Sequence, residues 1–176
     1  MATTKNLVGF TLTVAGEKQL DLRLGLLRTN VTDLTDLWPF VDEYLCYIEA
    51  EQFERQGARG GGGFEWAALK PGYALWKHIH YPGKPILVRE GDLKKSLTQK
   101  GGDHIFKAGR LGMTFGTEVP YAIYHQTGVA ETKLPARPPI KLLKKQDAVD
   151  IAGLIQRFIW KSGQGFERFT APTRVL

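Results

Sequence analysis

The segment from Phe115 to Leu142, FGTEVPYAIYHQTGVAETKLPARPPIKL, is the feature that most constrains how this chain can fold. Residues 114–117 and 121–124 are rich in β-branched and aromatic side chains, and Pro120 between them is typical of a strand start or sheet edge. Gly128 allows a turn, and the three prolines that follow it stiffen an extended stretch. No catalytic set of side chains accompanies this pattern. We therefore interpret the segment as a docking element.

The length and composition predict one domain. A chain of 176 residues, 43% of them hydrophobic and 24% charged, is typical of a soluble globular protein with one core. No apolar run approaches about 18 residues and the N-terminal stretch has no signal-peptide pattern, so we expect a protein that is used without secretion or membrane insertion. We expect one α+β domain over residues 1–161 and a tail, residues 162–176, whose ordering would require a neighbouring subunit.

The single cysteine and the net charge limit which bonds and partners the protein can have. Cys46 is the only cysteine, which excludes an internal disulfide, and its place on an expected helix favours a buried small hydrophobic role over a reactive thiol. The formal net charge is +6 and the positive charges are spread along the chain. That charge would suit a polyanionic partner such as DNA, although ordinary solvation of the surface is favoured.

Hydrophobic periodicity predicts the main elements. Alternating apolar residues in Val8–Val14 and Lys18–Leu26, around Gly16, predict a β-hairpin. A near-helical spacing predicts one long amphipathic helix over Asp33–Gln56 and a second over Asp147–Trp160.

The middle of the chain is rich in glycine, proline and aromatic residues. Gly57–Gly63 predicts a mobile loop, and Phe64–Tyr81 a short helix or turn over the core. We expect a helical turn over Asp92–Leu97 with Asp92 as its cap, and a strand over Leu111–Gly116. Tyr121–Tyr124 either continues that sheet or starts a short helix after the preceding proline.

No motif for chemistry emerges. The run Gly60–Gly63 lacks the Lys-Ser or Lys-Thr of a phosphate-binding loop. His78 and His80 could bind a metal ion together with His104 or His125, but without ligands at a characteristic spacing a packed or solvated pair is favoured. No nucleophile motif is present. We expect no enzyme, no cofactor and no metal site.

Three polar residues of the docking segment invite a role in contacts. We assign His125 and Gln126 to hydrogen bonds, either with buried backbone or across a subunit contact. Arg137 lies between Pro135 and Pro138, which would hold its backbone extended and present the guanidinium. A bidentate carboxylate on a neighbouring subunit and an intrachain salt bridge that anchors the segment are both open as its partner.

Four short phrases together carry a family resemblance. They are the aromatic-glycine turn around Phe64 and Trp66; Ile86-Leu87, Gly91-Asp92-Leu93 and Ser96-Leu97; Tyr121-Ala122, His125-Gln126 and Gly128; and Pro135-Ala136-Arg137-Pro138. In this order and spacing, over roughly Glu51–Arg157, the chain resembles the phage virion-morphogenesis family of Mu-like phages, also called the tail-completion family.

The resemblance implies a fold and a setting. The implied fold is a small antiparallel barrel-like sheet with a long amphipathic helix, a C-terminal helix and long loops. The implied role is that of a structural virion protein in the phage neck, a tail terminator or tail-completion protein. Such a protein forms a ring, expected to be a hexamer, around the DNA channel and joins the tail to the head-side connector. Its partners would be copies of itself, other neck, tail-tube, sheath or connector proteins, and weakly the passing genomic DNA, with assembly in the host bacterial cytoplasm and no membrane contact.

Within that setting we assign three groups of residues. The expected subunit or partner interface comprises Tyr121, Tyr124, His125, Gln126, Arg137 and Pro138. The expected loop contact comprises Arg59, Phe64 and Trp66. The expected lining of the DNA channel comprises Lys94, Lys95, Lys107 and Arg110. Two rivals remain: a basic, non-specific DNA-binding protein involved in DNA packaging, and a small hydrolase that would depend on His125.

Overall fold

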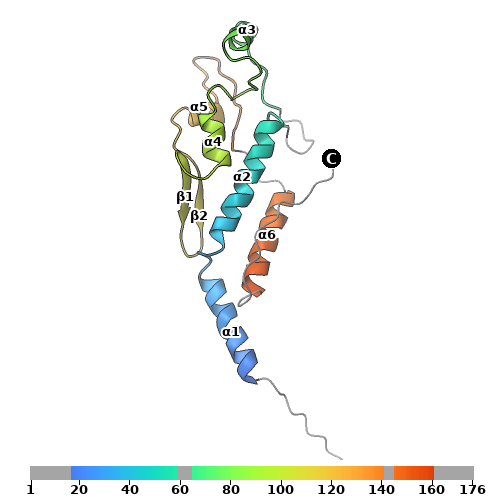
Figure 1. The fold of residues 1–176 in the computed structure, drawn as a ribbon, viewed down its shortest axis with the longest axis vertical. Helices are drawn as coiled ribbons and strands as arrows, with labels where there is room; N and C mark the ends of the chain where they lie inside the picture. The colour runs from blue at the N-terminus through green and yellow to red at the C-terminus, as the bar shows by residue number, and fades with distance from the viewer. Residues whose placement is uncertain (1–16, 59–64, 141–144, 161–176) are drawn as a thin grey trace, which may run out of the picture.

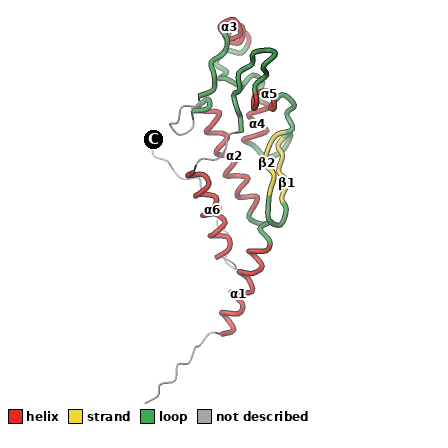
Figure 2. The backbone as a smooth tube through the Cα atoms, turned by 180° about the vertical axis from the view of Figure 1, so that it is seen from behind, coloured by secondary structure: helices red, strands yellow, loops and turns green. Residues whose placement is uncertain are grey.

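A central helix organises the fold in the computed structural model, which describes residues 17–58, 65–140 and 145–160. This helix is α2 (Trp38–Glu54), and it lies between a β-hairpin on one side and α6 (Lys145–Trp160) on the other (Figure 1). Helix α3 (Pro71–His80) lies at one end of the molecule, and α1 (Glu17–Thr32) extends from the other (Figures 1 and 2). The predicted α+β class is confirmed.

Helix α2 confirms the predicted long helix, with its start at Trp38 rather than near Asp33. Pro39 occupies the first turn, where the N–H that proline lacks would have no helical partner. The Trp38 indole donates a hydrogen bond of 2.6 Å to the Gly109 carbonyl, which ties the start of the helix to the hairpin. Helix α6 confirms the second predicted amphipathic helix.

Two hydrophobic clusters lie along α2. The first joins the N-terminal half of α2 to α6 and the hairpin, and its buried members are Leu37, Trp38, Val41, Tyr44, Ile48 and Leu154. The second surrounds the C-terminal end of α2 and is built largely from the long loops, with buried members Phe53, Trp66, Val88, Leu93, Leu97 and Val119. The loops are therefore part of the core, because they supply side chains that α2 alone could not cover.

The sheet is an antiparallel hairpin of β1 (His104–Ala108) and β2 (Met113–Thr117). Its register pairs His104 with Thr117 at one end and Ala108 with Met113 at the other. Strand β2 confirms the strand predicted around Leu111–Gly116. Across the described residues the sheet has two strands and does not close.

Helix α4 (Asp92–Thr98) lies beside this hairpin and corrects one detail of the prediction. Its N-cap is Gly91, at φ 103°, so Asp92 is the first helical residue and not the cap. A left-handed backbone favours glycine, and Asp92 in the first turn still complements the helix dipole.

The N-terminal hairpin is the clearest error among the sequence predictions. The half predicted over Lys18–Leu26 is helical and belongs to α1, while Val8–Val14 lies outside the described residues. Leucines at every second position imitate a strand, yet the segment consists largely of Leu, Arg, Lys, Gln and Glu, which are good helix formers, and has no β-branched residue before Thr29.

The remaining open segments are helical. Helix α5 (Ala122–Thr127) settles the ambiguity at Tyr121–Tyr124 in favour of a helix, and α3, which begins at Pro71, is the short helix expected within Phe64–Tyr81. Residues 59–63 of the loop predicted over Gly57–Gly63, and the predicted tail at 162–176, fall outside the described residues. None of the described helices combines the length and apolar character that crossing a bilayer requires.

Candidate functional site

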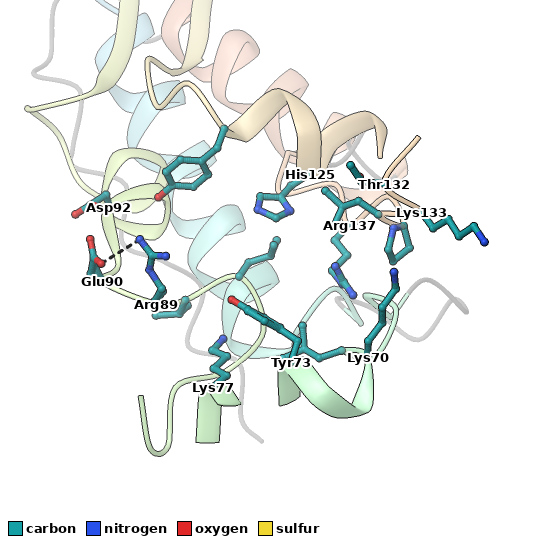
Figure 3. A pocket seen from close by; sticks show the side chains of 16 residues that line it. Lys70, Tyr73, Lys77, Arg89, Glu90, Asp92, His125, Thr132, Lys133 and Arg137 are labelled. Carbon is teal, nitrogen blue, oxygen red and sulfur yellow. Dashed lines mark ion pairs between the residues drawn. The ribbon is translucent and has the colours of Figure 1, made fainter. Parts of the chain in front are cut away.

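A cavity of about 580 Å³ opens between α3, the turn before α4, the start of α5 and the extended segment that follows α5 (Figure 3). Figure 3 shows Tyr73 and Lys77 on the α3 side, facing His125 and Arg137 across the cavity. Its volume lies in the range of about 300–1,000 Å³ that is usual for binding pockets. The docking segment predicted from sequence forms one of its walls.

That wall is fixed by a tight turn. Gly128 ends α5 at φ 74° and ψ 172°, and a Cβ there would lie 2.9 Å from the Ala136 nitrogen and the Leu134 oxygen. The turn is closed by paired backbone hydrogen bonds between Val129 and Leu134, of 3.0 and 2.9 Å. Glycine is therefore required at position 128, because a side chain would push the wall away from α5.

Arg137 leads from this wall into the protein, where its side chain is buried at 4% exposure. Its N–H donates to the His125 carbonyl at 2.7 Å. Its guanidinium donates from Nε to the Ala67 carbonyl at 2.6 Å and from Nη2 to the Ala68 carbonyl at 3.0 Å. The expected intrachain salt bridge is not seen, because among the described residues Arg137 is anchored by carbonyls and forms no salt bridge.

Lys77 is the opposing cation and was missed from sequence. It is 5% exposed and its Nζ donates to the Pro85 carbonyl at 2.5 Å. Its neighbours on α3 point the other way, since Leu75 is 63% and Ile79 65% exposed. The sequence carries no signal for this inversion, because periodicity alone predicts that the apolar face of a helix is the buried one.

The electrostatics of the pocket are strongly one-sided. Five cationic side chains line it against two acidic ones: Lys70, Lys77, Arg89, Lys133 and Arg137 against Glu90 and Asp92. Of these, the exposed Arg89 forms an ion pair of 3.1 Å with Glu90. The two buried cations have no described carboxylate to compensate them.

The pKa shifts follow from this arrangement. Burial, and then the Arg137 charge, lower the pKa of Lys77, and burial lowers the pKa of Arg137. Burial, and then Arg137, also lower the pKa of His125, whose Nδ1 is buried and has no hydrogen-bond partner in the described part of the chain. Each shift has the sign expected for positive charge held out of water without a counter-ion.

Three of the six expected interface residues meet in this pocket: Tyr121, His125 and Arg137. Tyr124 is 55% exposed on α5 and does not line the pocket. The Gln126 side chain forms two hydrogen bonds with the backbone of Ile140, of 2.8 and 3.2 Å. Of the two partners expected for Gln126, buried backbone or a subunit contact, the structure shows the backbone. The Pro138 carbonyl accepts a hydrogen bond of 3.0 Å from the Trp66 indole.

Trp66 needs a correction, since it was expected in a loop contact. It is 5% exposed and packs edge-on against Phe53, with ring centroids 5.2 Å apart, inside the second cluster. A large ring that fills the core cannot reach a partner. Arg59 and Phe64, the other two expected contact residues, lie outside the described residues.

The expected channel residues are spread along the length of the hairpin. Lys94 and Lys95 lie on α4, next to the end of the hairpin where Ser96 contacts Thr117. Arg110 lies in the turn at the other end of the hairpin, where it contacts Asp33 and the Thr32 carbonyl. Lys107 is exposed on β1 between them.

His104, one of the histidines weighed for a metal site, has other partners. Its Nε2 lies 2.9 Å from the Asp42 carboxylate and its Nδ1 2.8 Å from the Ser96 carbonyl, with both side chains buried. Cys46 completes a group whose ligand atoms lie within 4.8 Å of one another, a spacing that a metal ion could bridge. Both ring nitrogens of His104 already have hydrogen-bond partners, and burial raises the pKa of the Cys46 thiol to about 12, which keeps the thiol protonated. We therefore interpret the hydrogen bond between Asp42 and His104 as a structural link from α2 to β1.

Comparison with known proteins places the chain in a family. No curated protein and no solved structure matches it. The sequence model of the phage virion morphogenesis family matches residues 16–159, which is most of the chain and includes the pocket and both core clusters. The chain therefore belongs to the phage virion morphogenesis family, and its role is in the structure or assembly of the phage particle.

Proposed function

We propose that the protein is a neck component of a tailed phage, a tail terminator or tail-completion protein. In this proposal it forms a ring around the DNA channel and joins the tail to the head-side connector. It acts by binding other virion proteins and not by catalysis. Family membership supports the assembly role, and the surface described next supports a ring.

The inverted burial of α3 is the observation that carries the proposal. This helix buries a lysine and exposes a group of apolar side chains: Tyr73, Leu75, Trp76 and Ile79. A free protein gains nothing from this orientation, because it leaves apolar surface in water and holds a charge out of it. The orientation becomes favourable when a protein partner covers the exposed face.

A second apolar surface lies at the opposite end of the molecule. Helix α1 extends from the body there (Figure 1) and exposes Leu22, Leu24, Leu26 and Val31. Two unlike apolar surfaces on one protomer suit heterologous contacts, in which one surface of each copy meets the other surface of the next. Such contacts form a ring when the rotation between copies closes.

Absolute mass by light scattering tests the proposal, at low and moderate salt, with and without purified tail tubes. We expect a ring, or a monomer that becomes a ring on the tube. The double variant Leu75→Ser/Ile79→Ser should prevent ring formation while keeping the fold, because both side chains are exposed. The control is Val149→Ser, which removes a similarly exposed apolar side chain from α6.

A monomer that ignores tail tubes would refute the terminator form of the proposal. A DNA-packaging role would instead show tight binding to free DNA with a steep salt dependence. The separation of Lys94 and Lys95 from Arg110 by the length of the hairpin does not favour that rival.

A further inference from the structure

The pocket beside α3 holds two buried cations that lack a counter-ion. Lys77 and Arg137 are 5% and 4% exposed, and the hydrogen bonds of their side chains go to neutral backbone carbonyls. Holding a charge out of water is unfavourable unless an opposite charge pairs with it. The nearby His125 Nδ1 is a further buried polar atom without a partner among the described residues. An anion in the cavity would satisfy this site.

The same cavity has an apolar lining. Leu87, Val88, Leu134 and Pro135 form part of its wall, together with the Tyr73 ring. Leu87 is held there at φ 60°, a backbone conformation that is strained for a residue other than glycine and is found preferentially at binding sites. An occupant that matches both parts of the lining carries an anionic group next to apolar groups.

The shape of the site discriminates between anions. A phosphate on duplex DNA reaches cations on open surfaces, whereas Lys77 and Arg137 are 5% and 4% exposed and line a cavity of about 580 Å³. That volume accommodates a few side chains of a peptide. The exposed cations at the rim, Lys70 and Lys133, would attract an acidic segment before it enters.

We propose that this pocket binds a short segment of another virion protein in which an Asp or Glu side chain is flanked by apolar residues. The carboxylate takes the place between Lys77 and Arg137, and the flanking side chains lie on the apolar wall. Only the identity of the partner as a virion protein rests on the proposed neck function. The chemistry of the occupant rests on the pocket itself.

Fluorescence anisotropy with the full-length protein tests this site. The probe is a pool of fluorescein-labelled pentapeptides with Glu at the centre and varied apolar residues on both sides, and the matched pool has Gln in place of Glu. We expect the Glu pool to bind at least about tenfold more tightly than the Gln pool, the difference that a charge-assisted hydrogen bond supplies. A single-stranded oligonucleotide serves as the phosphate probe and should not compete.

Two variants assign the binding to the pocket. Lys77→Met removes the buried charge at similar volume and should weaken binding of the Glu pool about tenfold or more, without changing binding of the Gln pool. Lys77→Gln, which keeps a donor for the Pro85 carbonyl, replaces it if the first variant is unstable. The control Lys84→Met removes an exposed lysine that does not line the pocket and should leave binding within twofold.

The test of peptide binding in the pocket can be distinguished from the test of ring formation. Light scattering on Lys77→Met should give the same mass as the unmodified protein, since the exposed face of α3 is intact. Equal binding of the two pools, no binding of either, or competition by the oligonucleotide that depends on Lys77 would each overturn the proposal for the pocket. Loss of the ring in all samples would instead refute the neck proposal alone.

Discussion

Replacing Gly128 with alanine tests how the pocket wall is built. The residue has φ 74° and ψ 172°, a conformation nearly confined to glycine, and forcing another residue into it costs about 1–3 kcal/mol. The new Cβ would also lie 2.9 Å from two backbone atoms, Ala136 N and Leu134 O, which cannot rotate away. Relief requires the wall to shift and weakens the two hydrogen bonds between Val129 and Leu134, each of which contributes about 0.5–1.5 kcal/mol.

The expected loss is on the order of 3 kcal/mol, or a decrease in Tm of about 6–12 °C for a domain of this size. Thermal and urea unfolding followed by circular dichroism would measure it. Gly153→Ala is the matched control, because a Cβ in the middle of α6 meets only the end of the Arg157 side chain at 3.9 Å. That variant should gain about 1 kcal/mol from helix propensity. Changes of the same sign in the two variants, or a loss below about 0.5 kcal/mol at Gly128, would refute the reasoning.

Two further predictions follow from buried titratable groups. Burial lowers the pKa of His125, so the unfolded chain takes up a proton near pH 6.5 while the folded protein does not. The free energy of unfolding should therefore decrease as the pH falls below about 6.5 and level off below the pKa of His125 in the folded protein. Urea unfolding between pH 7.5 and 5 should show a smaller decrease in this free energy for His125→Gln than for the unmodified protein. An equal decrease in both proteins would contradict the assignment of the pH dependence to His125. Burial raises the pKa of Cys46 to about 12, so a thiol reagent at pH 8 should label it in urea but not in the native protein. Stoichiometric labelling of the native protein within minutes would show that the thiol is accessible.

The elements that the sequence predicted correctly are those with a strong local pattern. Helices α2 and α6 repeat apolar residues at a helical period over four turns, and β2 alternates over a short stretch. Gly128 was also interpreted correctly as a turn residue, because its backbone constraint is local. In α1 the two-residue spacing of the leucines led to the wrong prediction of a strand, because alternating leucines fit a strand while the intrinsic propensities of the residues favour a helix.

The site depended on contacts that no local pattern encodes. Phe115–Leu142 was predicted to be a docking segment from its prolines and its glycine, and three of its expected interface residues, Tyr121, His125 and Arg137, do meet at the pocket. The partner of Arg137 is a pair of carbonyls some seventy positions earlier in the sequence, at Ala67 and Ala68. Trp66 was expected on the surface and fills the core, because residues of distant loops cover it.

The sequence by itself determined the α+β class, the two long amphipathic helices and the family of this protein, because each depends on periodicity or on short phrases in a fixed order. Only the tertiary structure decided which face of α3 is covered. The helix exposes Leu75 and Ile79 and buries Lys77, whose Nζ donates to the Pro85 carbonyl. The wall opposite Lys77 includes Arg137, which lies sixty positions further along the chain. Burial is a property of the neighbours that folding brings together, so the cationic pocket exists only once those segments have packed.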